Sequence, residues 1–313
     1  MYKNLIKIPT LDMSHDEWLA HRQKSIGGSD ASSIIGLNPW SSPYSVWADK
    51  LGKISPKEDN EAMRQGRDLE SYVAQRFCEA TGKKVRRENN ILINPMYPFA
   101  HANVDRMVVG EDAGLECKTT SVLNMRNYKN GAFPDNYYVQ CVHYMMVTGC
   151  KKWYLAVLVL NKEFMVFEIE RDEEEIEALA KSEAEFWNLV EAKTAPMADG
   201  KEATTNTISI LYPESNEESV NLFAYESELQ QYMALSAQIK ELEKLKDEAA
   251  NKVKAFLGEA SGGSSNGYKV TWASSTRSTF DSKRFAAEHK DIDLSAYYKT
   301  SSYRTFKVTE NKI

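Results

Sequence analysis

The feature that most constrains the fold is a near-continuous apolar run from Trp153 to Leu160. Such a run is typical of a central strand that is buried on both faces of a sheet. It is far shorter than the roughly 20 apolar residues that a helix needs to cross a bilayer. Helical patterns lie on either side of it, over 136–148 and 173–192. We therefore expect an α/β (α+β) protein in which helices cover a central sheet.

Length and composition agree with a folded chain of about two domains. The 313 residues are 42% apolar and 27% charged, which is enough to bury a core and excludes wholesale disorder. The formal charge of −6 gives no global attraction for nucleic acid or anionic lipid, so a polyanion would have to be bound by a local arrangement of Lys and Arg.

The cysteines and the N-terminal residues exclude several further classes. Cys78, Cys117, Cys141 and Cys150 contain no CxxC pair, and their spacing fits neither a disulfide framework, a zinc ribbon nor an iron–sulfur cluster. No sustained apolar run follows the first residues, as it would in a signal peptide. We expect a soluble, reduced, cytoplasmic protein with no membrane partner.

Periodicity divides the chain into four segments. Residues 1–195 hold the alternating helices and strands, and 196–219 are linker-like. Residues 220–260 are rich in Glu and Lys with apolar residues at helical spacing, which predicts a long amphipathic, coiled-coil-like helix. Residues 261–313 form a small α+β appendage that begins with a flexible break at 261–265 and ends with a strand-like stretch at 303–308.

An expected hairpin brings two acidic residues and a lysine together. Strand-like residues 102–109 are followed by a glycine-containing turn and a return strand at 115–119. Glu116 and Lys118 share one face of the return strand, and Asp105 lies opposite them within about two residues of register. Carboxylates this close repel each other unless a cation lies between them.

This hairpin has two interpretations. Mg²⁺ prefers carboxylate, carbonyl and water oxygens, so the cluster suits a magnesium site. Lys118 would then activate a bound water or neutralise phosphate charge. Alternatively, the charges are solvated on a surface hairpin, and the motif taken alone favours this second interpretation.

Two helices offer further polar groups. Glu70 lies one turn after Gly66 on a helix expected over 60–81, and the missing side chain of Gly66 leaves room for a ligand beside the carboxylate. Gln140 and Tyr144 are spaced i and i+4, so they share one face of the helix over 136–148. Both can hydrogen-bond phosphate oxygens or metal-bound water without adding charge. Each pair alone is also explained by packing or by an ordinary surface position.

Taken in order, GxxxE, D, ExK and QxxxY resemble the motifs of the PD-(D/E)xK nuclease superfamily in its RecB-like branch. The segments 21–30 and 36–40 are similar to the phage YqaJ-type recombinase family, which is related to lambda exonuclease. The resemblance covers about residues 12–190. Ala102 stands where some relatives have Gly, which is a small-for-small change.

The resemblance implies a restriction-endonuclease-like core with a central mixed sheet flanked by helices, followed by the long helix and the appendage. It implies that Asp105, Glu116 and the carbonyl of Cys117 bind metal, with Glu70 binding directly or through water. Lys118 would activate the nucleophilic water and Gln140 would assist. The cofactor would be Mg²⁺, as two ions with Mn²⁺ as a substitute, and no iron–sulfur cluster.

The resemblance also implies a site for a terminal 5′-phosphate at Arg22 and Ser29, with Tyr144 contributing to DNA binding. Arg22 provides a bidentate cation, and residues 27–29 provide N–H groups at the start of a short helix. Ordinary helix capping by Ser29 and Asp30 explains the same residues equally well.

The expected function is a Mg²⁺-dependent exonuclease that degrades one strand of linear duplex DNA from 5′ to 3′, in a bacterial or phage-infected cell. The resemblance implies that a single-strand annealing protein receives the 3′ strand in phage recombination and that the enzyme forms a ring-shaped homo-oligomer. Two alternatives remain open: a structure- or sequence-specific endonuclease of the same superfamily, and a catalytically inactive DNA-binding or assembly module that uses the long helix.

Overall fold

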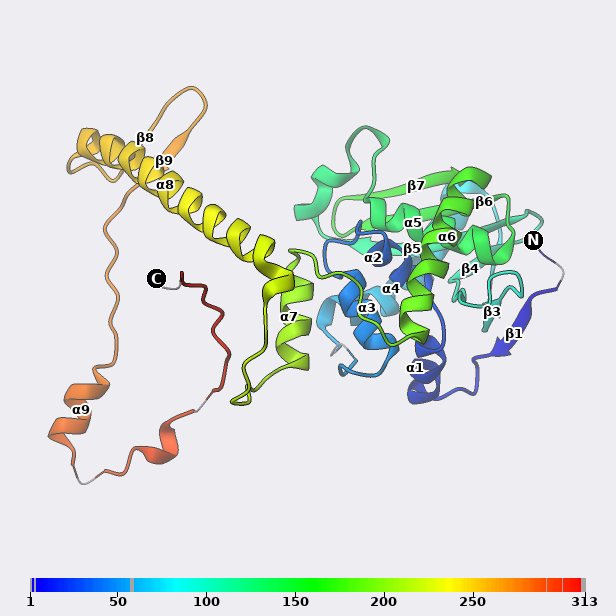
Figure 1. Ribbon diagram of the computed structural model, residues 1–313. Coiled ribbons are helices and arrows are strands. Elements are labelled where there is room, and N and C mark those ends of the chain that lie inside the picture. Colours follow the sequence, from blue (N-terminus) through cyan, green and yellow to red (C-terminus); the bar gives the residue numbers. More distant parts are fainter. Residues whose placement is uncertain (1, 3, 57–58, 291, 300, 311–313) are drawn as a thin grey trace. The chain divides into compact units, whose positions relative to one another are not determined.

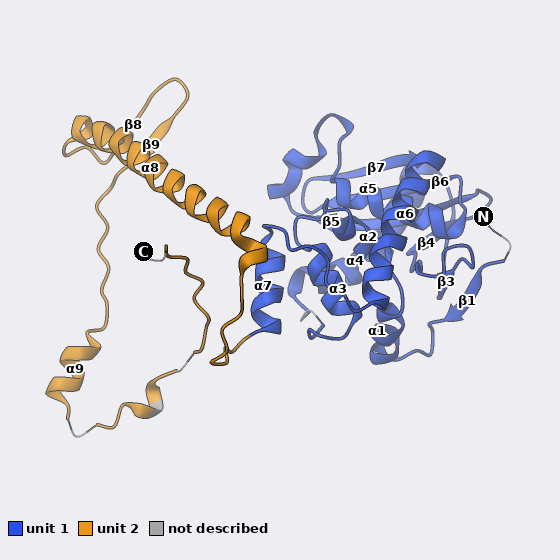
Figure 2. Cartoon of the chain, viewed as in Figure 1, with its two compact units in different colours: residues 1–212 blue, residues 213–313 orange. Residues whose placement is uncertain are grey.

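The computed structural model describes residues 2, 4–56, 59–290, 292–299 and 301–310. The chain divides into two compact units, 1–212 and 213–313, which have different colours in Figure 2.

A five-stranded mixed sheet forms the centre of the first unit (Figure 1). Its strands lie in the order β2 (Val85–Arg87), β4 (Arg106–Val108), β5 (Ala113–Thr120), β6 (Lys152–Val159) and β7 (Glu163–Glu170). Strands β5 and β6 are parallel, and the other neighbours are antiparallel. A smaller sheet pairs β1 (Ile6–Pro9) with β3 (Asn90–Ile93). The expected mixed α/β core is confirmed.

Helices cover both faces of this sheet. The helices of the first unit are α1 (His15–Gln23), α2 (Gly28–Ile34), α3 (Pro43–Lys50), α4 (Glu61–Thr81), α5 (Asp135–Thr148), α6 (Glu173–Glu191) and α7 (Glu202–Leu211), with a 3₁₀ segment η1 (Val122–Gly131). Strand β6 shows why its sequence is apolar throughout. Tyr154 packs against Phe77 of α4, whereas Trp153 and Leu155 pack on the other face with residues of α5 and α6.

The ends of α4 and α5 agree with the sequence. Each helix stops at a glycine, Gly82 and Gly149, whose φ of +71° is a left-handed conformation that other residues rarely adopt. Helix α4 begins after Asn60, whose side chain accepts a hydrogen bond from the N–H of Met63.

The strand expected over 102–109 is shorter than predicted. Regular pairing covers β4 alone, and Ala102 instead forms an isolated bridge with Leu92 of β3. The chain therefore changes partner between Ala102 and Arg106, leaving the small sheet and joining the large one. Asp105 lies at this change of direction, immediately before β4.

Part of the expected linker at 196–219 is helical. Helix α7 packs on α3, and the hydroxyl of its Thr204 donates a hydrogen bond of 2.8 Å to the Ser42 hydroxyl. Thr204 and Thr207 are buried. Their β-branched side chains are weak helix formers, so packing rather than local propensity determines this helix.

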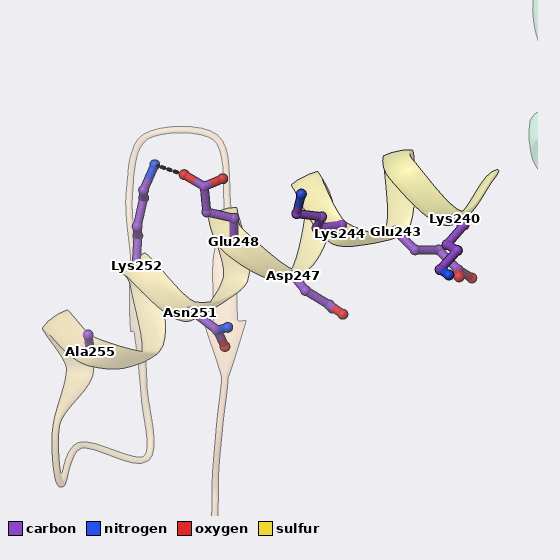
Figure 3. A pocket seen from close by; sticks show the side chains of 8 residues that line it. All are labelled: Lys240, Glu243, Lys244, Asp247, Glu248, Asn251, Lys252 and Ala255. Atoms are coloured by element: carbon purple, nitrogen blue, oxygen red, sulfur yellow. Dashed lines mark hydrogen bonds and ion pairs between the residues drawn. The ribbon is translucent and has the colours of Figure 1, made fainter. Parts of the chain in front are cut away.

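The second unit consists of η2 (Phe223–Tyr225), the long helix α8 (Glu226–Leu257), the hairpin β8 (Gly262–Ser264) and β9 (Lys269–Thr271), α9 (Ser282–Glu288) and η3 (Ser295–Tyr297). No residue of α8 is buried within the unit. Figure 3 shows charged side chains on the C-terminal half of α8, with an ion pair between Lys252 and Glu248.

Three expectations for the second unit are corrected. The long helix begins at Glu226 rather than at 220, because a 3₁₀ turn precedes it. The break expected at 261–265 contains β8, whose glycines permit close pairing with β9. The stretch 303–308 has the alternation of a strand but no neighbouring strand to pair with, and it is not a strand in the described chain.

Among the described residues, no helix combines the length and apolar character needed to cross a bilayer.

Candidate active site

The sheet places Asp105 beside the start of the ExK motif. Arg106 pairs with Leu115 in the β4–β5 register, so Asp105 lies next to Glu116 and Cys117. The N–H of Cys117 donates a hydrogen bond of 2.8 Å to Oδ2 of Asp105. Glu116 and Lys118 project from one face of β5, and Nζ of Lys118 donates to Oε1 of Glu116 at 2.6 Å. The hairpin geometry expected from the sequence is therefore present.

Helix α5 adds an amide to this cluster. Nε2 of Gln140 donates to Oε1 of Glu116 at 2.8 Å and to the Tyr144 hydroxyl at 2.8 Å. Gln140 and Tyr144 thus share a helix face, as their spacing predicts, but both are buried. The Tyr144 hydroxyl accepts the hydrogen bond from Gln140 inside the protein. The buried Tyr144 side chain therefore does not lie at a surface where DNA would contact it.

Burial makes the two carboxylates of this cluster costly. It raises the pKa of Asp105 well above its usual range, and the nearby Glu116 and Glu70 raise it further. It also raises the pKa of Glu116, against the lowering effect of Lys118. Burial lowers the pKa of Lys118, but Glu116 and Asp105 outweigh that effect and raise it above its usual range. Both carboxyl shifts follow from placing two acidic groups close together in an enclosed site, where the charged form of each is disfavoured.

Glu70 reaches the cluster from α4 and is held by a cation. Its carboxylate accepts a hydrogen bond from Nη1 of Arg106, and the same nitrogen donates to the carbonyl of Asp105 at 2.7 Å. Outside its own helix, and among the described residues, a Cβ added at Gly66 would have Thr119 Oγ1, at 3.8 Å, as its one neighbour within 4 Å. The space expected beside Glu70 is therefore open.

The donor set of this cluster suits a hard divalent cation. Oε2 of Glu116 is buried and has no hydrogen-bond partner among the described residues, which leaves a carboxylate oxygen available to a ligand. Asp105 supplies a second carboxylate, and Cys117, whose N–H binds Asp105, follows Glu116 in β5 and adds a backbone carbonyl. In the described part of the chain no three His, Cys, Asp or Glu side chains form a preassembled cage, and Glu70 is engaged by Arg106. Two carboxylates and a carbonyl are the ligand types that Mg²⁺ prefers.

A hollow of about 370 Å³ opens beside Glu70 and Asp105. Trp18, Arg67 and Arg87 contribute to its wall. An aromatic ring and two guanidinium groups next to the carboxylates would suit bases and phosphates of a nucleic acid strand.

Arg22 and Ser29 form a second cluster at the junction of α1 and α2. Nη2 of Arg22 donates to the Ser29 hydroxyl at 3.0 Å, and its guanidinium carbon lies 5.0 Å from the centre of the Trp18 ring. Gly28, next to Ser29, packs against Tyr144 and Gln140 and so places the Arg22–Ser29 cluster beside the carboxylate cluster. A Cβ added there would lie 2.6 Å from Cε1 of Tyr144, so α2 packs directly on the helix face that carries Gln140.

Two contacts in these clusters are not predicted from the sequence. Arg106 forms an ion pair with Glu70. The sequence indicates a role for Arg106 in the site through its position directly after Asp105. Lys50 forms a buried ion pair with Asp30. These residues lie 20 positions apart without a shared motif, and only the packing of α3 on α2 brings them together.

Comparison with known proteins confirms the resemblance found in the sequence. Residues 17–151 match the family described as the YqaJ-like viral recombinase domain, and this range contains every proposed site residue. The chain is 40% identical over 305 residues to "Uncharacterized protein YqaJ" of Bacillus subtilis (strain 168), covering 96% of this chain and 95% of that protein.

Among solved structures, the alkaline exonuclease LHK-Exo from Laribacter hongkongensis matches with a TM-score of 0.50 and 21% identity, over 57% of this chain and 93% of that one. This likeness shows the fold, which is the restriction-endonuclease-like core expected from the sequence. The family match and the near full-length relative establish that the chain belongs to the YqaJ-like viral recombinase family.

Proposed function

We propose that the protein is a metal-dependent deoxyribonuclease that degrades one strand of linear duplex DNA from 5′ to 3′. One observation carries the proposal. The carboxylates of Asp105, half-buried directly before β4, and of Glu116, buried in β5, lie together, and the Lys118 ammonium donates to Glu116. A protein gains little stability from such a cluster, so its value lies in binding a cation.

Asp105, Glu116 and the carbonyl of Cys117 would hold a divalent ion, Mg²⁺ with Mn²⁺ as a substitute. Glu70 would bind metal directly or through water, and two ions would be bound in all. When bound, the metal supplies a water of lowered pKa and neutralises charge on the scissile phosphate.

The protein side chains orient the reacting groups. Lys118 orients the attacking water and neutralises negative charge on the phosphate, for which its raised pKa suits it because the ammonium form dominates at neutral pH. Gln140 fixes the Glu116 carboxylate through its hydrogen bond, and Tyr144 fixes Gln140 in turn. These contacts keep Glu116 in one orientation before substrate arrives.

The second cluster would recognise the DNA end. The Arg22 guanidinium and the Ser29 hydroxyl provide charged and neutral donors for a terminal 5′-phosphate. The family relationship further supports a 3′ single-stranded product that is passed to an annealing protein, and a ring-shaped homo-oligomer. The nuclease domain would lie within residues 1–195.

The test uses five duplex substrates: linear DNA labelled at one end or at the other, linear DNA with and without a 5′-phosphate, and covalently closed circular DNA. The proposal predicts Mg²⁺-dependent release of nucleotides from the 5′ end, faster with a 5′-phosphate, and no cleavage of the circle. Cleavage of the circle would identify an endonuclease, and absence of cleavage with every divalent ion would identify a binding module.

A further inference from the structure

The Arg22 side chain belongs to a charge cluster that extends into the protein. Nζ of Lys50, whose side chain is 0% exposed, donates to Oδ2 of Asp30 at 2.6 Å. The same nitrogen donates to the backbone carbonyl of Arg22 at 2.7 Å. Oδ2 of Asp30 also accepts from the N–H of Gly27 at 3.0 Å. Lys50, at the end of α3, thus connects the end of α1 with the start of α2.

The two cations bind Asp30 unequally. Nη2 of Arg22 lies 3.5 Å from Oδ1 of Asp30, at the limit of a hydrogen bond, whereas Lys50 makes a short contact. The same Arg22 nitrogen donates to Ser29 at 3.0 Å. The Arg22 side chain is 28% exposed and Ser29 is exposed, so these donors can reach a ligand. Lys50 therefore satisfies the buried carboxylate that would otherwise capture Arg22.

Removing Lys50 would leave Asp30 without its closer cation. A buried carboxylate that loses its partner takes the nearest remaining cation, because an unpaired buried charge is costly. For Asp30 that cation is Arg22. The guanidinium would move from the long contact to a close pair with Asp30, away from the surface that it shares with Ser29.

We infer that Lys50 is a positioning residue for end recognition: by holding Asp30 and the Arg22 carbonyl, it keeps the Arg22 guanidinium available to a terminal phosphomonoester dianion. This inference rests on the proposed function. Lys50 is enclosed and touches no ligand, and it acts through Arg22. It determines how strongly the protein prefers a phosphorylated end over a hydroxyl end, rather than the rate of phosphodiester cleavage itself.

The test measures the ratio of initial cleavage rates on linear duplexes with a 5′-phosphate and with a 5′-hydroxyl, for the full chain with Mg²⁺. Lys50→Met is expected to reduce this ratio at least tenfold, with the rate on the 5′-hydroxyl duplex within about threefold of wild type. The double variant Asp30→Asn/Lys50→Met removes the competing carboxylate as well and is expected to restore the ratio to within about threefold.

Lys53→Met is the matched control, because it makes the same change at an exposed lysine whose ammonium lies over the Trp47 ring, and it should leave the ratio unchanged. A wild-type ratio in Lys50→Met would overturn the inference, as would a double variant that folds but lacks the preference. If Lys50→Met does not fold, the double variant still decides the matter, since it buries no unpaired charge. A wild-type protein without any preference would instead refute the proposed end recognition.

Discussion

Gly28 provides a sharp test of the packing that joins the two clusters. Alanine at this position would place its Cβ 2.6 Å from Cε1 of Tyr144 and 3.1 Å from Cγ of Gln140. Ordinary van der Waals contact begins at 3.4 Å, so α2 and α5 would have to separate by about 0.8 Å, the difference between 3.4 and 2.6 Å. Both neighbours are buried and cannot swing into solvent.

Overpacking of this kind costs about 1–3 kcal/mol, and the higher helix propensity of alanine returns less than about 1 kcal/mol. We expect a net loss of about 1–2 kcal/mol for Gly28→Ala, which for a unit of this size lowers Tm by about 2–8 °C. Displacement of Gln140 would also release Glu116 and reduce nuclease activity.

Gly66→Ala is the matched control, since it is the same change in a helix where the nearest described atom outside that helix lies 3.8 Å from the added Cβ. It should stabilise the protein by about 0.5–1 kcal/mol. The assay is urea unfolding followed by far-UV circular dichroism. If Gly28→Ala is as stable as Gly66→Ala, the close packing of α2 on Tyr144 is wrong.

Three further predictions follow from the site. Lys118→Ala should reduce cleavage of linear duplex DNA at least about 10²-fold, measured by release of labelled nucleotides, and wild-type cleavage by this variant would exclude a catalytic role for the ammonium. Cys117→Ala should keep cleavage within about threefold, because the proposed ligand is the backbone carbonyl; a large loss would point to the thiol instead. Burial and the nearby Lys50 lower the pKa of His101 to about 3. Between about pH 6.5 and pH 3 the unfolded chain therefore holds a proton on this ring that the folded chain lacks, and the contribution of His101 to stability falls by about 1.4 kcal/mol per pH unit. His101→Gln should flatten this dependence in urea unfolding, and an unchanged pH profile would contradict the buried neutral imidazole.

Local sequence signals predict the elements of the first unit well. The glycine stops of α4 and α5, the apolar run of β6 and the register that brings Asp105 to Glu116 all depend on residues close together in the chain or on a two-residue alternation. These signals are sufficient for the hairpin and for the Gln140–Tyr144 pair.

Contacts between distant segments are the part that the sequence does not reveal. The ion pairs of Arg106 with Glu70 and of Lys50 with Asp30 depend on how α3 and α4 pack, and no spacing rule links their members. The position of helix α7 depends on its packing against α3, and the length of β4 depends on its pairing with β2 and β5. Burial of Tyr144 likewise follows from Gly28 on another helix.

The most direct test of the metal site is calorimetric titration of Mn²⁺ into the wild-type protein, Asp105→Asn/Glu116→Gln, and the control Glu88→Gln. Glu88 is a buried carboxylate as well, but Lys7 and Arg86 already pair with it. The account predicts saturable binding to the wild type and the control, and none to the double variant. Equal binding by all three proteins would contradict a cation site at Asp105 and Glu116.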